Sequence, residues 1–138
     1  MLAPSAPDVP ASFLRWLERM DGEGRIFLST VTVHEIEKGI TRLERKGATA
    51  RAAGLRGWLS GLIAGYGDKI LDFDAAAAIV SGGLEAEAIA GGHNPGMADA
   101  IIAGMARMHG LIVVSRNMRH FMPFGIGVSS PEDVDGLE

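Results

Sequence analysis

Short apolar segments alternate with longer stretches of helical periodicity along this chain, and this alternation restricts the possible fold more than any other feature. The clearest apolar segment is residues 111–115; residues 25–29 and 69–73 are similar, and residues 126–129 are a possible edge strand. Strands separated by helices predict a parallel sheet covered by helices on both faces. We therefore expect one α/β domain over residues 1–138, without an internal boundary.

The expected helices have recognisable ends. Thr32, with Glu35 three residues later, forms a capping-box pattern, and Asp74 is a good N-cap for the alanine-rich stretch that follows it. Asn94 and Pro95 suit the start of a further helix. We therefore expect helices over about residues 8–20, 32–45, 50–63, 75–90 and 94–109.

The composition excludes several classes of protein. Thirteen Lys and Arg against 17 Asp and Glu give a net charge of -4, so metal ions or a local basic patch would have to support any binding of nucleic acid. The sequence has no cysteine, which excludes disulfides, thiolate zinc sites and cysteine nucleophiles. We see neither a signal peptide nor an apolar stretch of about 20 residues, and we expect a cytoplasmic protein.

Asp99 is the most informative single residue. It lies in residues 97–106, a stretch that is apolar on nearly every side of a helix, and its i+3 and i+4 neighbours are Ile102 and Ala103. An ionised carboxylate is costly to bury unless it is paired, hydrogen-bonded or bound to a cation. Asp99 is therefore either a functional acid or a structural one that caps a loop or pairs with an arginine.

Glu35 and Asn117 also carry oxygen atoms, and both follow predicted strands. Side chains just after parallel strands meet at one end of a sheet. Together with Asp99 they would form an oxygen-rich cluster that suits Mg²⁺ or Mn²⁺. Two alternatives stay open, because Glu35 could serve only the capping box and Asn117 only a turn.

Other site motifs do not occur in the sequence. His34-Glu35 lacks a second histidine at position 38, and there is no phosphate loop, dinucleotide fingerprint or nucleophile elbow. Basic residues gather after this histidine, where they could contact phosphates or simply form a solvated helical face. They are Lys38, Arg42, Arg45, Lys46, Arg51 and Arg56.

Four blocks of sequence are more specific than any single residue. They cover residues 27–40, 70–74, 98–111 and 115–121. In composition, order and spacing these blocks resemble the PIN-domain ribonucleases of the VapC/FitB toxin type, and the similarity extends from Val9 to essentially the end of the chain. It implies a PIN-like three-layer α/β fold with a central parallel sheet flanked by helices.

The resemblance implies a metal-dependent endoribonuclease that cleaves RNA phosphodiester bonds. Glu35 would be the second acidic residue of the family's metal cluster, Asp99 the third, and Asn117 would hold the fourth position. The two carboxylates would bind Mg²⁺ or Mn²⁺, which activates water and offsets charge on the phosphate. Many members are toxins that a cognate antitoxin holds inactive, and they commonly dimerise. We therefore expect an RNA substrate, an antitoxin partner and a homodimer, with no membrane association.

Two features depart from the family pattern. Members open with a strand whose Asp is the first metal ligand, whereas this sequence begins at Met1-Leu2-Ala3-Pro4, which resembles the segment after that strand. His120 also stands where many relatives have Asp. We therefore expect a PIN-like domain whose first strand is missing and whose activity is impaired, either because the start is placed too late or because the gene is truncated.

Two other hypotheses are retained. A catalytically inactive PIN-like module would bind an antitoxin-like partner or a second copy, through side chains that core packing would otherwise explain: Trp16, Trp58, Leu59 and Leu62. An unrelated phosphatase or response-regulator-like domain would need an Asp at the end of an early strand, where Ser29 stands.

Overall fold

Residues 11–134 are described by the computed structural model, and helices predominate among them. In chain order, the elements are α1 (Ala11–Gly22), β1 (Leu28–Ser29), α2 (Thr30–Arg45), α3 (Thr49–Tyr66), η1 (Gly67–Lys69), β2 (Ile70–Leu71), α4 (Ala75–Ala90), α5 (Met97–Met108), β3 (Val113–Val114), η2 (Met118–His120), η3 (Met122–Phe124) and β4 (Val128–Ser129). The alternation of helices and strands confirms the predicted α/β class.

The strands are parallel, as predicted, but they form two separate pairs. β1 pairs with β2 and β3 pairs with β4, and each strand is only two residues long. Within residues 11–134 no strand joins the two pairs, so the single central sheet of the prediction is divided. Helix packing therefore supplies most of the contacts that hold this domain together.

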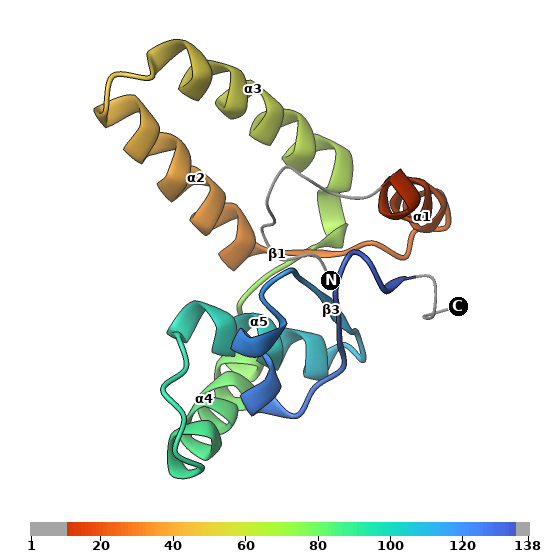
Figure 1. The fold of residues 1–138 in the computed structure, drawn as a ribbon, viewed down its shortest axis with the longest axis vertical. Helices are drawn as coiled ribbons and strands as arrows, with labels where there is room; N and C mark the ends of the chain where they lie inside the picture. Colours follow the sequence, from red (N-terminus) through yellow and green to blue (C-terminus); the bar gives the residue numbers. More distant parts are fainter. Residues whose placement is uncertain (1–10, 135–138) are drawn as a thin grey trace.

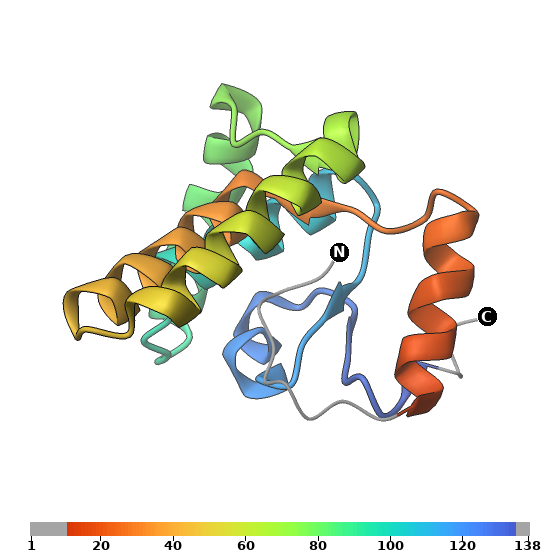
Figure 2. The ribbon, with the colours of Figure 1, turned by 90° about the horizontal axis from the view of Figure 1, so that it is seen from above.

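The helices leave the strands in different directions. In Figure 1, α2 and α3 form an antiparallel arm on one side of the strands, while α4 and α5 pack together on the other. Figure 2 shows that α1 stands on the far side of the strands from this arm. The first turns of α2 and α5 lie where the arm meets the α4–α5 pair.

α5 is the centre of the largest core. Its residues 100–106 are all buried, as the apolar sequence of this stretch predicts. α4 contacts it with one face, and Gly104 of α5 lies directly against Ser81 of α4. A Cβ atom at Gly104 would lie 2.8 Å from the Ser81 Cα atom and closer still to its hydroxyl. The two helices can approach this closely only because position 104 has no side chain.

Two smaller cores complete the packing. The arm buries Ile40, Ala52 and Leu59 between α2 and α3. The helix α1 packs its apolar face against the strands and the end of the described chain, in a cluster made of Phe13, Trp16, Met20, Ile26, Val114 and Val134.

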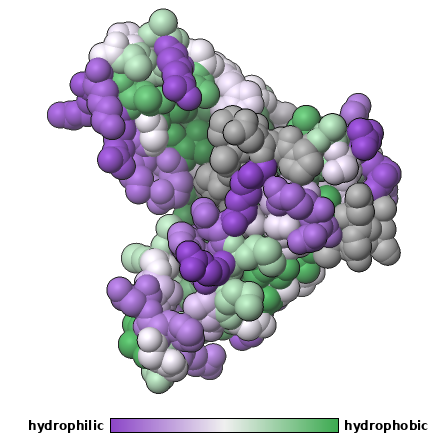
Figure 3. Space-filling view, viewed as in Figure 1, coloured by the Kyte–Doolittle hydropathy of each residue, from purple (hydrophilic) through white to green (hydrophobic). Residues whose placement is uncertain are grey.

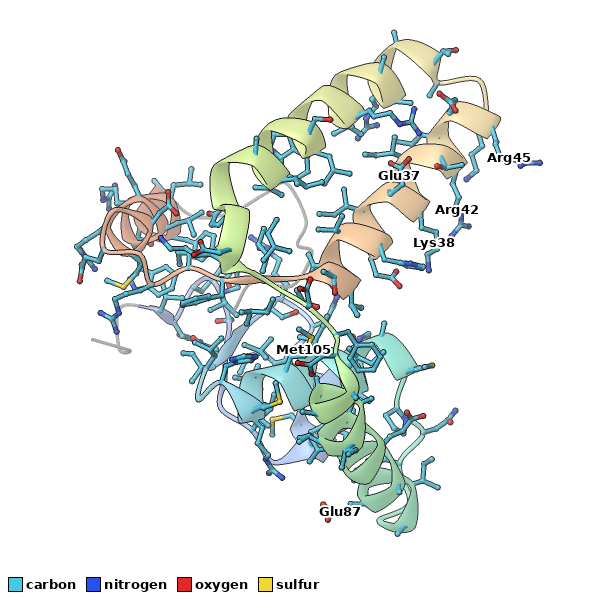
Figure 4. The ribbon with its side chains drawn as sticks, turned by 180° about the vertical axis from the view of Figure 1, so that it is seen from behind. Glu37, Lys38, Arg42, Arg45, Glu87 and Met105 are labelled. Atoms are coloured by element: carbon cyan, nitrogen blue, oxygen red, sulfur yellow. The ribbon has the colours of Figure 1, made fainter. Side chains whose placement is uncertain are left out.

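A buried serine is the last residue of β1, and another directly follows β3. Ser29 follows Leu28 and accepts a hydrogen bond from the Val31 amide at 2.9 Å, while its own hydroxyl donates to the Met105 Sδ atom at 3.3 Å. Ser115 accepts from the Asn117 amide at 3.0 Å in the same way. These bonds turn the chain sharply after each strand, and Figure 4 shows Met105 below the start of α2.

The capping box predicted at Thr32 is wrong. Helix α2 begins two residues earlier, at Thr30, and its N-cap is Ser29. The Ser29 hydroxyl accepts a hydrogen bond from the backbone amide of Val31, so the helix is capped at Ser29 and Thr32 already lies inside it. Thr32 is buried inside the helix, with no hydrogen-bond partner for its hydroxyl in the described part of the chain. Glu35 is therefore not used as a cap.

The other helix ends agree with the prediction to different degrees. Asp74 caps α4 by accepting from the Ala77 amide at 2.9 Å, as expected. The helix expected from Asn94 begins at Met97 instead, because Asn94 and Pro95 belong to the preceding loop and Gly96 is the N-cap. Of the helix predicted over residues 8–20, residues 8–10 lie outside the described residues. Across residues 11–134, no helix has the length and apolarity needed to cross a bilayer.

We expect Gly104→Ala to destabilise the protein, since its methyl group would force α4 and α5 apart. Overpacking of a core typically costs about 1–3 kcal/mol, which urea unfolding would measure as a lower midpoint. Gly83→Ala in α4 is the matched control, because nothing lies within 4 Å of its added Cβ and alanine favours helices by about 1 kcal/mol. Equal effects of the two substitutions would contradict the close helix contact.

Candidate functional site

The candidate site lies where the first two turns of α2 meet the first turn of α5. Glu35 lies in the second turn of α2, whose start is fixed by the Ser29 cap, and Asp99 lies in the first turn of α5. The amino end of α5 favours the carboxylate of Asp99 electrostatically. The side chains of Glu35 and Asp99 keep 29% and 28% of their surface exposed, so both carboxylates are partly buried but reachable from solvent.

Asp99 was expected to be buried in an apolar helix, and it is instead half-buried at the edge of that core. Burial raises the pKa of Asp99 above the ordinary value of 3.8; His120 opposes this effect and the negative charge of Glu35 adds to it. Glu35 also lines the same hollow as Met97 and Ala98, which directly precede Asp99 in α5. The structure therefore brings together the two acids that the sequence singled out.

Each carboxylate has a basic neighbour. The Lys38 Nζ atom lies 3.0 Å from Glu35 Oε2, one helical turn further along α2. The His120 Nδ1 atom lies 3.4 Å from Asp99 Oδ2, a contact that becomes an ion pair when the imidazole is protonated. Both basic side chains are more than half exposed, so they can leave the acids without disturbing the core.

His120 is the residue whose place sequence reasoning did not anticipate. The sequence marked it only as a departure from the family pattern, whereas the structure sets it against Asp99. The short helix η2 produces this contact by turning the chain just after Asn117. The Lys38 contact, in contrast, could have been found from its i+3 spacing to Glu35.

Asn117 is less closely joined to the site than predicted. It is exposed and is the N-cap of η2, and its backbone amide donates a hydrogen bond to the Ser115 hydroxyl. Within residues 11–134 no hydrogen bond links its side chain to Glu35 or Asp99. Its position three residues before His120 nevertheless keeps it on the segment that borders Asp99.

Two adjoining hollows give access to the acids. One is lined by Asp99 and His120, together with the loop before α5 and Arg119. The other contains Glu35 and is mostly apolar, with Phe73, Met97 and Ile101 among its walls. Because the first turn of α5 lines both hollows, a bound chain could contact both carboxylates at once.

The pair of acids fits part of a site for an oxygen-liganded cation. Carboxylate oxygens are the ligands that Mg²⁺ and Mn²⁺ prefer, and a cation would relieve the repulsion that helps to raise the pKa of Asp99. Residues 11–134 contain no group of three or more His, Cys, Asp or Glu side chains that could hold a metal ion. The described residues thus bring two carboxylates to this place and do not form a complete metal cluster.

Comparisons with known proteins place this geometry in context. The family model described as PIN domain matches residues 7–121 of the chain. A relative from Shigella flexneri, the tRNA(fMet)-specific endonuclease VapC, is 34% identical over 103 residues, which cover 75% of this chain and 72% of the relative.

Solved structures agree with the sequence comparison. DNA-bound VapBC from Salmonella typhimurium is similar with a TM-score of 0.69 and 31% identity, covering 88% of this chain and 86% of that one. FitAcB from Neisseria gonorrhoeae has a TM-score of 0.72 over 96% of this chain and 99% of that one, and at 23% identity this likeness shows the fold alone.

We expect Asp99→Asn to raise the free energy of unfolding at neutral pH. Because the pKa of Asp99 is raised in the folded protein, the native state holds this proton more tightly than the unfolded state does. The folded protein is therefore less stable as the pH rises from the ordinary pKa of Asp99 through its raised pKa. The amide does not titrate, so wild type and variant should converge below the ordinary pKa of 3.8.

Urea unfolding at pH 7 and at about pH 3 would measure this difference. Asp68→Asn, at an exposed position in η1, is the matched control and should leave stability unchanged. An Asp99→Asn protein that is less stable than wild type at pH 7 would show that Asp99 serves the fold rather than a site.

Proposed function

This chain belongs to the PIN domain family, and we propose that it is a metal-dependent endoribonuclease that acts as the toxin of a toxin–antitoxin pair. The observation that carries the proposal is the meeting of Glu35 and Asp99. They come from separate helices, the charge of Glu35 adds to the raised pKa of Asp99, and both face solvent through two adjoining hollows. Paired acids with a perturbed pKa in an accessible hollow are typical of catalytic sites.

The proposed substrate is an RNA phosphodiester. The VapC relative from Shigella flexneri is described as a tRNA(fMet)-specific endonuclease, and its similarity covers more than two thirds of each chain. RNA cleavage by this chain is consistent with two carboxylates that solvent can reach, because hydrolysis of a phosphodiester needs an activated water and a means to offset the phosphate charge. We place this activity in the cytoplasm.

The proposed metal is Mg²⁺ or Mn²⁺, held by Glu35 and Asp99. When bound, such an ion supplies a water of lowered pKa and positive charge against the phosphate. Asn117 is proposed as a further catalytic residue, from the segment that also carries His120. Its amide could orient a substrate oxygen, and its exposed position permits this without loss of packing.

The basic neighbours have a role of their own in this proposal. In the absence of a cation, Lys38 offsets the charge of Glu35 at 3.0 Å, and His120, when its imidazole is protonated, offsets that of Asp99 at 3.4 Å. Both side chains are long or exposed enough to turn away when the acids bind a cation. They would then be free to contact the phosphate of the substrate, whose negative charge they match.

An antitoxin partner and a homodimer belong to the same proposal. The related Salmonella and Neisseria structures are of VapBC and FitAcB. Helix α4 exposes large apolar side chains, with Ile79 at 78% and Ile89 at 57% exposure. Large apolar side chains that a helix leaves exposed are available for a protein–protein contact.

A catalytically inactive binding module is the second candidate. It is favoured by the lack of a three-ligand cluster within residues 11–134 and by the basic neighbour of each acid. Of the side chains suggested for partner contacts, Trp58 is 53% exposed and therefore available, whereas Trp16 and Leu59 are buried and serve the core.

We expect the protein to cleave a mixed RNA substrate with Mn²⁺ and to lose this activity in both Glu35→Gln and Asp99→Asn. Substitutions that only surround a metal ligand typically lower activity 10–100-fold, so loss of a ligand should lower the cleavage rate by more than about 100-fold. Glu87→Gln is the matched control, since Glu87 is exposed near the end of α4 and lies away from α2 in Figure 4.

Three outcomes separate the candidates. Loss of cleavage in both site variants, with normal cleavage by the control, supports the ribonuclease. Cleavage by Glu35→Gln and Asp99→Asn at the wild-type rate would place the active site elsewhere. An inactive wild type with either Mg²⁺ or Mn²⁺ would leave the binding module as the better account of this chain.

A further inference from the structure

One face of α2 carries a row of basic side chains that leads away from the candidate site. His34, Lys38, Arg42 and Arg45 follow one another at intervals of four, four and three residues, so they lie along one side of the helix. All four are exposed. Figure 4 shows Lys38, Arg42 and Arg45 on the same side of α2, with Glu37 on the side toward α3. This set of four residues is called the basic face below.

Within the basic face, Lys38 is paired with Glu35, but the other acidic residues of α2 do not neutralise Arg42 and Arg45. Arg56 of α3 binds Glu37 at 3.1 Å and Glu44 at 2.9 Å, and so holds both carboxylates on the side of α2 that packs against α3. No ion pair joins Arg42 or Arg45 to any carboxylate of residues 11–134. The two arginines therefore present their charge to solvent. Figure 3 shows a hydrophilic surface along the outer edge of the arm.

The basic face is connected with the candidate site through neighbouring hollows. A shallow hollow on α2 is lined by His34, Lys38 and Arg42, with Glu37 and Thr41. His34 also lines the hollow that contains Glu35. The row from His34 to Arg45 spans roughly 16 Å at 1.5 Å per residue, a length that can accommodate more than one backbone phosphate.

We propose that the phosphate backbone of single-stranded RNA lies along the basic face of α2 and enters the candidate site at Glu35. The proposal rests on the proposed function, because it assumes that RNA is the substrate of that site. The net charge of -4 makes a local basic surface necessary for binding a polyanion. Because arginine contacts to phosphates carry no sequence information, the face should govern affinity and leave the choice of cleavage position to the hollows beside Glu35 and Asp99.

The test measures binding separately from cleavage. In a cleavage-deficient Asp99→Asn background, the affinity of the full chain for a fluorescent single-stranded RNA is measured over a range of salt concentrations. The double variant Arg42→Gln/Arg45→Gln is compared with Arg15→Gln, which removes one exposed positive charge on α1, away from the arm. Circular dichroism checks that each variant is folded.

We expect the double variant to bind RNA at least ten-fold more weakly at low salt. The slope of log Kd against log salt concentration should fall by about 1.4, because each phosphate contact to a single strand contributes about 0.7. Arg15→Gln should change neither quantity. An acidic peptide should bind much more weakly than RNA, because the basic face is long enough to contact several of the regularly spaced phosphates of an RNA backbone.

Unchanged affinity and an unchanged salt slope in the double variant would overturn the proposal, as would an acidic peptide that binds the face more tightly than RNA. Failure of this proposal and failure of the proposed function give different results. RNA that binds through Arg42 and Arg45 to a protein that never cleaves would support the binding face and contradict the ribonuclease. Cleavage that is unaffected by Arg42→Gln/Arg45→Gln would support the ribonuclease and contradict the binding face.

Discussion

The close contact of α5 with α4 is the constraint on which the rest of this domain depends. Gly104 lets the two helices approach until α5 is buried over residues 100–106. A helix held so firmly cannot shift along its axis without opening cavities or clashes. Its first turn is therefore fixed in space, and Asp99 with it. The Ser29 hydroxyl also fixes the start of α2 relative to α5, because it contacts Met105 of α5 and caps α2, which carries Glu35.

The same rigidity explains why two acids can remain near each other at some expense of stability. Burial and the charge of Glu35 both raise the pKa of Asp99, so the ionised pair is held together by the packing behind it and not by mutual attraction. Such unfavourable arrangements persist where the surrounding structure determines them, and they are common at functional sites. Lys38 and His120 offset part of the repulsion from positions at the surface.

The sequence predicts the class of the fold and singles out Glu35 and Asp99 as candidates, and it fails where tertiary contacts decide. Periodicity identifies α4 and α5, and the apolar surroundings of Asp99 single it out, because these features are local. The division of the sheet into two pairs depends on which strands meet, and that cannot be seen in short apolar segments. The helix start at Thr30 was missed because the Ser29 hydroxyl prevails over the capping-box pattern at Thr32. The approach of His120 to Asp99 depends on the turn of η2, which has no distinctive pattern.

Charge is distributed so that an acidic protein can present a basic surface beside an acidic site. Arg56 gathers Glu37 and Glu44 on the α3 side of the arm, and α2 is left with a positive outer face. At the end of that face lie Glu35 and Asp99, whose carboxylates are partly buried. We propose that these two acids hold one divalent ion together. Calorimetric titration of Mn²⁺ into wild type, Glu35→Gln and Asp99→Asn tests it most directly. We expect one site in the wild type and a marked loss of affinity in each variant, whereas unchanged Mn²⁺ binding in both variants would contradict the claim.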